Sequence, residues 1–140
     1  MAVIADSGAL YALYDRRDRN HRRVAAAVAE ETGAILIPAA VLAEIDYLLR
    51  VRLGAKAGQQ FLEGIERGAF IVEAFTLEDA SFCRRLLARY HDLDLGLADA
   101  AVAAVAERRG ILTILTVDER HFRAIRTQSG KPFTILPADA

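Results

Sequence analysis

The chain has little that would tie it to a membrane, to disulfide chemistry or to secretion. Its only cysteine is Cys83, so an intramolecular disulfide and a cysteine-rich zinc site are both excluded. The longest stretch without charge, 32–43, is too short for a membrane span and is interrupted by Pro38. Residues 1–6 contain neither a basic region nor an apolar run, so no secretory signal is visible. We therefore expect a soluble, cytoplasmic protein.

Linkers, repeats and low-complexity segments are also absent from the sequence. The 140 residues are 54% hydrophobic, which is ample for a buried core and excludes the composition typical of disordered chains. We therefore predict one domain that spans residues 1–140.

Lysine is scarce, because Lys56 and Lys131 are the only lysines and the other 16 of the 18 basic residues are arginine. The net charge of -1 argues against a uniformly basic surface for nucleic acid. Arginine suits phosphate recognition, but codon composition that favours Arg and Ala gives the same bias, and we favour that explanation. Net charge alone therefore does not identify a partner.

Short apolar runs alternate with helical segments along the chain. Near-continuous apolar runs suit strands buried on both faces of a sheet, and five are present: 2–5, 34–37, 69–75, 111–117 and 133–136. Glycines and Pro38 delimit the predicted helices, which are about 20–31, 38–54, 56–67, 78–90, 97–109 and a short one after residue 118. This alternation predicts an α/β fold with a parallel sheet covered on both faces. In such folds ligands bind beyond the carboxyl ends of the strands.

Two predicted strands end in an aspartate. Asp6 ends the first strand and Asp118 follows the fourth. Each could simply cap the helix that follows it. If the first and fourth strands are neighbours, however, the two carboxylates meet across the crevice.

Two further acids occupy unusual positions on predicted helices. Glu44 falls within the apolar stripe of its helix, near Val41 and Leu48. A carboxylate in such a position needs a bound cation, a buried salt bridge to an arginine, or a side chain that extends to solvent at the helix end. Asp99 begins an apolar helix and could complement the helix dipole. Its neighbours three, four and seven residues later are all apolar, which predicts that its side chain lies on the core-facing side.

The joint occurrence of these four acids at one edge of the sheet predicts a bound cation. Carboxylates at close range repel one another unless a cation lies between them. Oxygen ligands without a Cys or His cluster select a hard ion, Mg²⁺ or Mn²⁺. Such an ion activates water and stabilises the leaving oxygen of a phosphodiester. The residues therefore indicate hydrolysis of phosphodiester bonds.

Four segments resemble, in order, the motifs of PIN-domain ribonucleases: DSGAL at 6–10, AEI at 43–45, LADA at 97–100 and LTVD at 115–118. The small single-domain form is similar to the VapC-type toxins of bacterial VapBC toxin–antitoxin pairs. The resemblance covers essentially the whole chain. It implies a three-layer α/β/α fold with a five-stranded parallel sheet ordered 3-2-1-4-5.

The resemblance also implies an activity and a set of roles. The protein would be an endoribonuclease dependent on Mg²⁺ or Mn²⁺. Asp6 and Asp99 would hold the principal ion, Glu44 would contact it directly or through water, and Asp118 would orient the nucleophilic water or a second ion. Thr116 and Ser7 would support these carboxylates; many members have Thr where this chain has Ser7. The family further implies a homodimer and a cognate VapB-type antitoxin that blocks the acidic groove.

Three other readings use the same alternating architecture. A phosphoacceptor receiver needs an Asp closing the third strand and a Lys closing the fifth, but the third ends Phe75-Thr76 and Lys131 precedes the fifth. A haloacid-dehalogenase-like phosphatase needs an Asp at position 8, which is glycine. The alternative that stays open is a catalytically inactive PIN-like module that binds RNA or protein.

The remaining polar features have plainer explanations. One short segment contains five arginines: Arg16, Arg17, Arg19, Arg22 and Arg23. They could contact RNA phosphates. We favour the alternative that they form a solvated helix start paired with Asp15 and Asp18. The three histidines, at positions 21, 91 and 121, are predicted to lie on the surface. Cys83 is predicted to be a small core residue.

Overall fold

The structure is a computed structural model, and it describes residues 2–140. All five predicted strands are present. β2 has the expected length, shifted by one residue, and the other four are shorter than expected: β1 Val3–Ala5, β2 Ile35–Pro38, β3 Ile71–Glu73, β4 Thr113–Leu115 and β5 Thr134–Leu136. The helices are α1 Ser7–Tyr14, α2 His21–Glu30, α3 Ala39–Leu53, α4 Ala55–Glu66, α5 Leu77–Arg89, α6 Leu97–Arg109 and α7 Glu119–Ala124, with a 3₁₀ turn at His91–Leu93.

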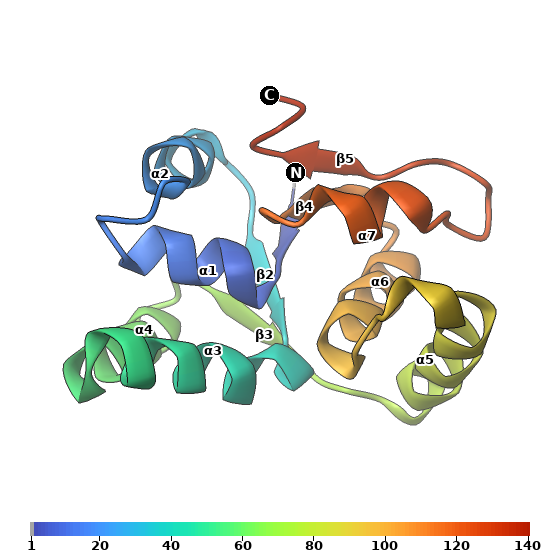
Figure 1. Cartoon of the computed structure of the whole chain (residues 1–140), viewed down its shortest axis with the longest axis horizontal. Helices are drawn as coiled ribbons and strands as arrows, with labels where there is room; N and C mark the ends of the chain where they lie inside the picture. The colour runs from blue at the N-terminus through green and yellow to red at the C-terminus, as the bar shows by residue number, and fades with distance from the viewer. Residues whose placement is uncertain (1) are drawn as a thin grey trace.

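The strands form one parallel sheet in the order β3-β2-β1-β4-β5 (Figure 1). β1 lies between β2 and β4, with Ile4 paired with both Leu36 and Ile114. The predicted fold class and strand order are both confirmed. The carboxyl ends of β1 and β4 are therefore adjacent, as a site shared between them requires.

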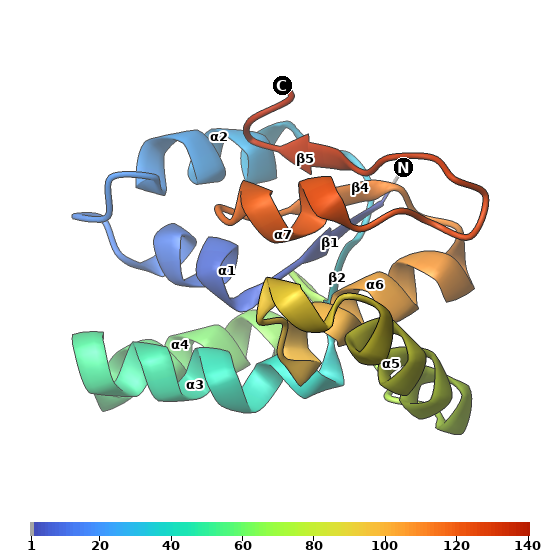
Figure 2. The ribbon, with the colours of Figure 1, turned by 45° about the vertical axis from the view of Figure 1, so that its right-hand side comes forward.

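Helices cover both faces of this sheet. Figure 1 shows α1, α3 and α4 on one side of the strands and α5 and α6 on the other. α2 lies beside the C-terminal segment, with which it shares the lining of a surface pocket (Figure 2). None of the helices described over residues 2–140 is both long enough and apolar enough to cross a membrane.

α6 is the central helix of the fold. Every residue from Ala100 to Ala106 is buried, because α6 packs on β1 and β2, on α3 and on α5. A helix that is apolar on all sides is expected to be buried on all sides. Its N-terminal turn, which carries Asp99, consequently lies over the central strands rather than at the edge of the molecule.

The structure corrects the expected burial of two elements. β3 is an edge strand, and Ile71 is 48% exposed rather than buried on both faces. Glu44 is exposed, because the buried stripe of α3 is formed by Val41, Ile45 and Leu49 at intervals of four residues. The second apolar side of α3 is not covered by this chain, so the expected burial of Glu44 is wrong.

Candidate active site

Asp6 both caps a helix and belongs to the acidic site. Its Oδ1 accepts a hydrogen bond from the Ala9 N–H at 2.9 Å, which is an N-cap contact to α1. Its Oδ2 accepts a hydrogen bond from the Thr116 hydroxyl, across the β1–β4 boundary. The two explanations offered for Asp6 are therefore not alternatives. Its side chain is held from both sides and is almost entirely buried.

Thr116 connects Asp6 to the turn that carries Asp118. Its Oγ1 accepts a hydrogen bond from the Asp118 N–H at 3.0 Å while its hydroxyl proton is directed at Asp6. Ser7, the other predicted supporting residue, is the first residue of α1 and is also buried. Thr116 is thus placed where a residue that orients carboxylates is expected.

Asp99 lies in the first turn of α6. Its Oδ2 is 3.5 Å from the Gly96 N–H, a long capping contact at the helix N-terminus. The negative charges of Asp118 and Glu44 act on it, and Asp99 and Asp118 in turn act on Asp6. Asp6, Asp99 and Asp118 therefore lie close enough for their charges to act on one another, and the exposed Glu44 acts on Asp99.

His121 is a member of this cluster that the sequence analysis missed. It is buried, and its Nδ1 lies 3.0 Å from Asp118 Oδ2 and 3.6 Å from Asp99 Oδ2. Among the buried side-chain atoms of residues 2–140, only this Nδ1 has no hydrogen-bond partner of acceptable geometry. The predicted surface position of His121 is wrong. The spacing Asp118-x-x-His121 at the start of a short helix is the signal that could have indicated it, since such residues share one helix face.

Asp118 does not act as the helix cap proposed for it. It occupies the N-cap position of α7, but its carboxylate accepts no capping hydrogen bond and faces His121 instead. A carboxylate that gives up its cap contact is available for another partner. This correction favours the functional interpretation of Asp118.

Burial and crowding of negative charge perturb the acids. Burial, reinforced by the charges of Asp99 and Asp118, raises the pKa of Asp6 from 3.8 to about 7, against the opposing hydrogen bonds from Thr116 and Ala9. The pKa of Asp99 is also raised, chiefly by burial. Within residues 2–140, no lysine or arginine nitrogen lies within 4.0 Å of any of the four carboxylates. Among residues 2–140, the only basic group beside these carboxylates is therefore the imidazole of His121, next to Asp99 and Asp118.

The donor set fits a hard divalent cation in its chemistry. Clustered carboxylate oxygens without a cationic partner are the ligands that Mg²⁺ and Mn²⁺ take. In the arrangement of residues 2–140, however, no three His, Cys, Asp or Glu side chains form a ready-made metal site. Binding a cation would thus require side chains of the cluster to reorient.

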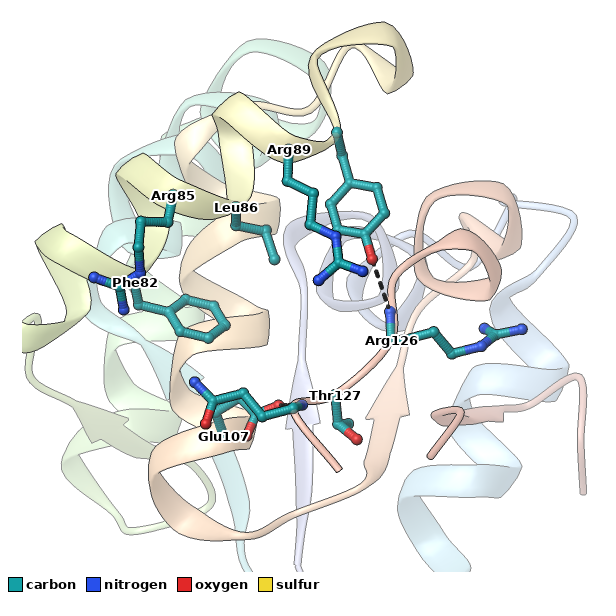
Figure 3. A pocket seen from close by; sticks show the side chains of 9 residues that line it. Phe82, Arg85, Leu86, Arg89, Glu107, Arg126 and Thr127 are labelled. Carbon is teal, nitrogen blue, oxygen red and sulfur yellow. Dashed lines mark hydrogen bonds between the residues drawn. The ribbon is translucent and has the colours of Figure 1, made fainter. Parts of the chain in front are cut away.

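The pocket in Figure 3 lies elsewhere. It has a volume of about 290 Å³ and lies where the C-terminal parts of α5 and α6 meet residues 126–128, with Phe82 and Leu86 directed into it. The Tyr90 hydroxyl accepts a hydrogen bond from the Arg126 N–H at its mouth. Because Asp99 is at the opposite end of α6, this pocket is separate from the acids.

Comparisons with known proteins identify the family and support the fold. The PIN-domain family model matches residues 3–127, and the chain belongs to this family. Within it, the chain is 33% identical over 135 residues to Ribonuclease VapC26 of Mycobacterium tuberculosis, covering 96% of this chain and all of that protein.

Solved structures of VapC proteins share the fold. The structure of M. tuberculosis VapC20, described as a sarcin–ricin loop cleaving toxin, has a TM-score of 0.77 at 23% identity and covers 84% of this chain and 91% of that one. VapBC2 of Rickettsia felis, bound to a DNA fragment from its promoter, has a TM-score of 0.67 at 15% identity, with 96% and 97% coverage. At this level of identity, the likeness shows the fold alone.

Proposed function

We propose that the protein is an endoribonuclease of the VapC type that depends on Mg²⁺ or Mn²⁺. The observation that carries the proposal is the convergence of Asp6, Asp99 and Asp118 with no lysine or arginine nitrogen within 4.0 Å among residues 2–140. Burial, reinforced by the charges of Asp99 and Asp118, raises the pKa of Asp6 to about 7. Burial of uncompensated carboxylates costs stability, and a fold keeps such a cluster when a bound cation compensates it. The ribonuclease relative and the PIN family match support the same chemistry.

The chain supplies the residues for this reaction from four places: the end of β1, α3, α6 and the β4–α7 turn. Asp6 and Asp99 would hold the cation, and Glu44 and Asp118 would contact it or orient the attacking water. When bound, the cation activates a water molecule and neutralises charge on the phosphodiester. Thr116 keeps one oxygen of Asp6 fixed and anchors the turn of Asp118, so both carboxylates stay on the same side of the sheet.

The direct test is cleavage of labelled RNA by the purified protein during a titration with Mn²⁺. We expect cleavage that requires the ion and stops on chelation. Asp99→Asn should abolish it, whereas Asp46→Asn, a change of the same kind at a half-exposed acid paired with Arg50, should not. RNA binding without cleavage at every Mn²⁺ concentration would instead support the inactive binding module.

We also propose that the protein forms a homodimer and is neutralised by a VapB-type antitoxin. Large apolar side chains of α3 are exposed, with Tyr47 at 57% and Val51 at 58%, and Leu77 at the start of α5 is 87% exposed. Exposed apolar residues of this size are typical of protein interfaces. Light scattering should give twice the monomer mass for the free protein, and coexpression with the antitoxin should relieve its toxicity. A monomer at all concentrations would contradict the dimer.

A further inference from the structure

The arginine-rich segment 16–23, which runs from the α1–α2 turn into the first residues of α2, carries positive charge that its own acids do not neutralise. The expected ion pairs with Asp15 and Asp18 are not formed. Across residues 2–140, no ion pair involves any of the five arginines of this segment, Arg16, Arg17, Arg19, Arg22 and Arg23. Asp15 instead accepts hydrogen bonds from the Tyr11 hydroxyl at 2.6 Å and from the Arg17 N–H at 3.0 Å. Asp18 accepts one from the Asn20 N–H at 2.8 Å. Both acids shape the turn, and the guanidinium groups remain available.

Two of these arginines border the acid cluster. Arg19 and Arg23, with Asn20 between them, line one side of a pocket of about 370 Å³. Figure 2 shows the beginning of α2, which carries this side, near the beginning of α7. The other side is formed by the β4–α7 turn and the C-terminal segment: Thr116, Val117, Glu119, Pro137 and Ala138.

The charge balance of this pocket is positive although a carboxylate lines it. Glu119 shares Arg123 with Asp139, at 3.0 and 2.6 Å, so the positive balance of the pocket comes from Arg19 and Arg23, whose two charges outnumber the one of Glu119. Thr116 is the residue whose hydroxyl is bonded to Asp6. A positively charged pocket therefore opens directly beside an uncompensated acidic cluster, at the same edge of the sheet.

We propose that Arg19, Asn20 and Arg23 form a subsite that binds a phosphate of the RNA strand next to the bond that is cut. The proposal rests on the endoribonuclease function given above and adds to it the residues that hold the substrate strand. Guanidinium groups bind phosphate oxygens through two parallel hydrogen bonds, and the Asn20 amide offers further donors. An RNA strand brought to the acid cluster carries a phosphate at every nucleotide. A neighbouring phosphate thus fits a cationic pocket that shares a wall with the site.

The test measures RNA binding separately from cleavage. A fluorescent single-stranded RNA is titrated with the full-length protein in chelator, so that no metal-dependent cleavage occurs, over a series of salt concentrations. The variant is Arg19→Gln/Arg23→Gln. The matched control is Arg84→Gln/Arg85→Gln, which changes the net charge equally at exposed arginines of α5.

We expect the Arg19→Gln/Arg23→Gln protein to bind RNA about 10- to 100-fold more weakly and to lose about 0.7 from the slope of log K against log salt, because the subsite holds one phosphate and each phosphate contact on a single strand contributes about 0.7. The control should keep the parental slope. In cleavage assays with Mn²⁺, KM should rise with little change in kcat, since these residues position the strand and do not touch the acids.

Two results would overturn the subsite. One is an unchanged affinity and slope in Arg19→Gln/Arg23→Gln. The other is an equal loss of RNA affinity and slope in the Arg84→Gln/Arg85→Gln control, which would show that the effect comes from the overall charge of the protein and not from this pocket. Neither depends on catalysis, so a protein that fails to cleave RNA would contradict the endoribonuclease proposal while the binding comparison still decides the subsite.

Discussion

Asp6 and Asp79 are both buried aspartates at helix N-termini, yet their surroundings are opposite. Asp79 closes a capping box with Thr76 and receives two hydrogen bonds from Arg108, at 3.1 and 3.2 Å. Burial alone would raise the pKa of Asp79, but the hydrogen bonds from Arg108 and Thr76 outweigh it and lower that pKa. Asp6 has no cationic partner among residues 2–140, and its pKa is raised.

The difference separates a structural acid from a functional one. The carboxylate of Asp79 on α5 is paired with Arg108 of α6. Arg108 also contacts Glu73 at 3.2 Å and the Ala74 carbonyl, so this ion pair links α5, α6 and the end of β3. The charge of Asp6 is left without compensation in the isolated chain. Burial of an acid is therefore not informative by itself; its partners decide which kind of site it forms.

The largest expected effect is that of Asp6→Asn on catalysis. Loss of this charge should reduce RNA cleavage at least about a thousandfold, because the cation loses a principal ligand. Without metal, the same variant should be about 1–3 kcal/mol more stable than the parent at pH 8, since an uncompensated buried charge is removed. Cleavage assays and chemical denaturation in chelator measure the two effects. A variant that is less stable and still active would remove the distinction between the two aspartates.

Asp79→Asn should show the reverse pattern. Breaking this half-buried ion pair should destabilise the protein by about 2–3 kcal/mol, with Glu73 partly compensating Arg108. Per folded molecule, cleavage should be unchanged. Denaturation and activity of the same preparation test this, and a loss of cleavage without a loss of stability would show that Asp79 acts on the site.

The dependence of stability on pH should also differ in sign between the two acids. For Asp6, whose pKa rises from 3.8 to about 7 on folding, the folded state binds the proton more tightly, so its contribution to stability falls as pH increases from 3.8 to 7 and is constant above 7. For Asp79, whose pKa is lowered, the contribution is present above 3.8 and is lost as pH falls through the lowered value. Denaturation of the parent, Asp6→Asn and Asp79→Asn in chelator from pH 2 to pH 8 measures both. Parallel curves for all three proteins would contradict this assignment.

His121→Asn should weaken the cation site without removing it. The imidazole lies 3.0 Å from Asp118 and 3.6 Å from Asp99, so it is placed to orient both carboxylates. Loss of such a neighbour typically reduces metal affinity by a factor of about ten to a hundred. Calorimetric titration with Mn²⁺ gives the affinity, and His91→Asn, at an exposed histidine, is the matched control. Equal affinities for parent and His121→Asn would exclude the positioning role.

Gly8→Ala should have the smallest effect. A Cβ at position 8 would lie 3.2 Å from Val117 Cγ2 and 3.7 Å from Asp6 Oδ1, so the turn that carries Asp118 must shift by a few tenths of an ångström. A displacement of this size in a catalytic cluster should lower kcat by a factor of about three to ten, with the fold intact. Kinetics and circular dichroism of the variant check this, and a kcat equal to that of the parent would show that the turn adapts freely.

Much of the fold could be predicted from the sequence because its signals are local. Apolar runs, Gly110 after α6 and Pro38 before α3 located the strands and helices within a few residues. Their shared edge followed from Asp6 and Asp118 ending two strands, once the family resemblance supplied the strand order. These features depend on periodicity and chain direction, which the sequence carries directly.

What could not be predicted depends on which surfaces become covered. A helical wheel placed Glu44 near apolar residues, but it does not show that Tyr47 and Val51 on that side stay exposed. The charges around His121 suggested a surface position, whereas its side chain is buried beside Asp99 and Asp118. Ion pairs of the arginine segment were expected from proximity in sequence, but Asp15 and Asp18 bond to the turn instead. Each of these outcomes depends on tertiary contacts between segments rather than on the local sequence.

The central claim is that the carboxyl ends of β1 and β4 and the first turn of α6 share one divalent cation. The most direct measurement is the anomalous difference density of a crystal soaked in Mn²⁺ at pH 8. We expect a peak in contact with the carboxylates of both Asp6 and Asp99. A fully occupied peak elsewhere with none at this position, or no peak in contact with these two side chains at saturating Mn²⁺, would contradict it.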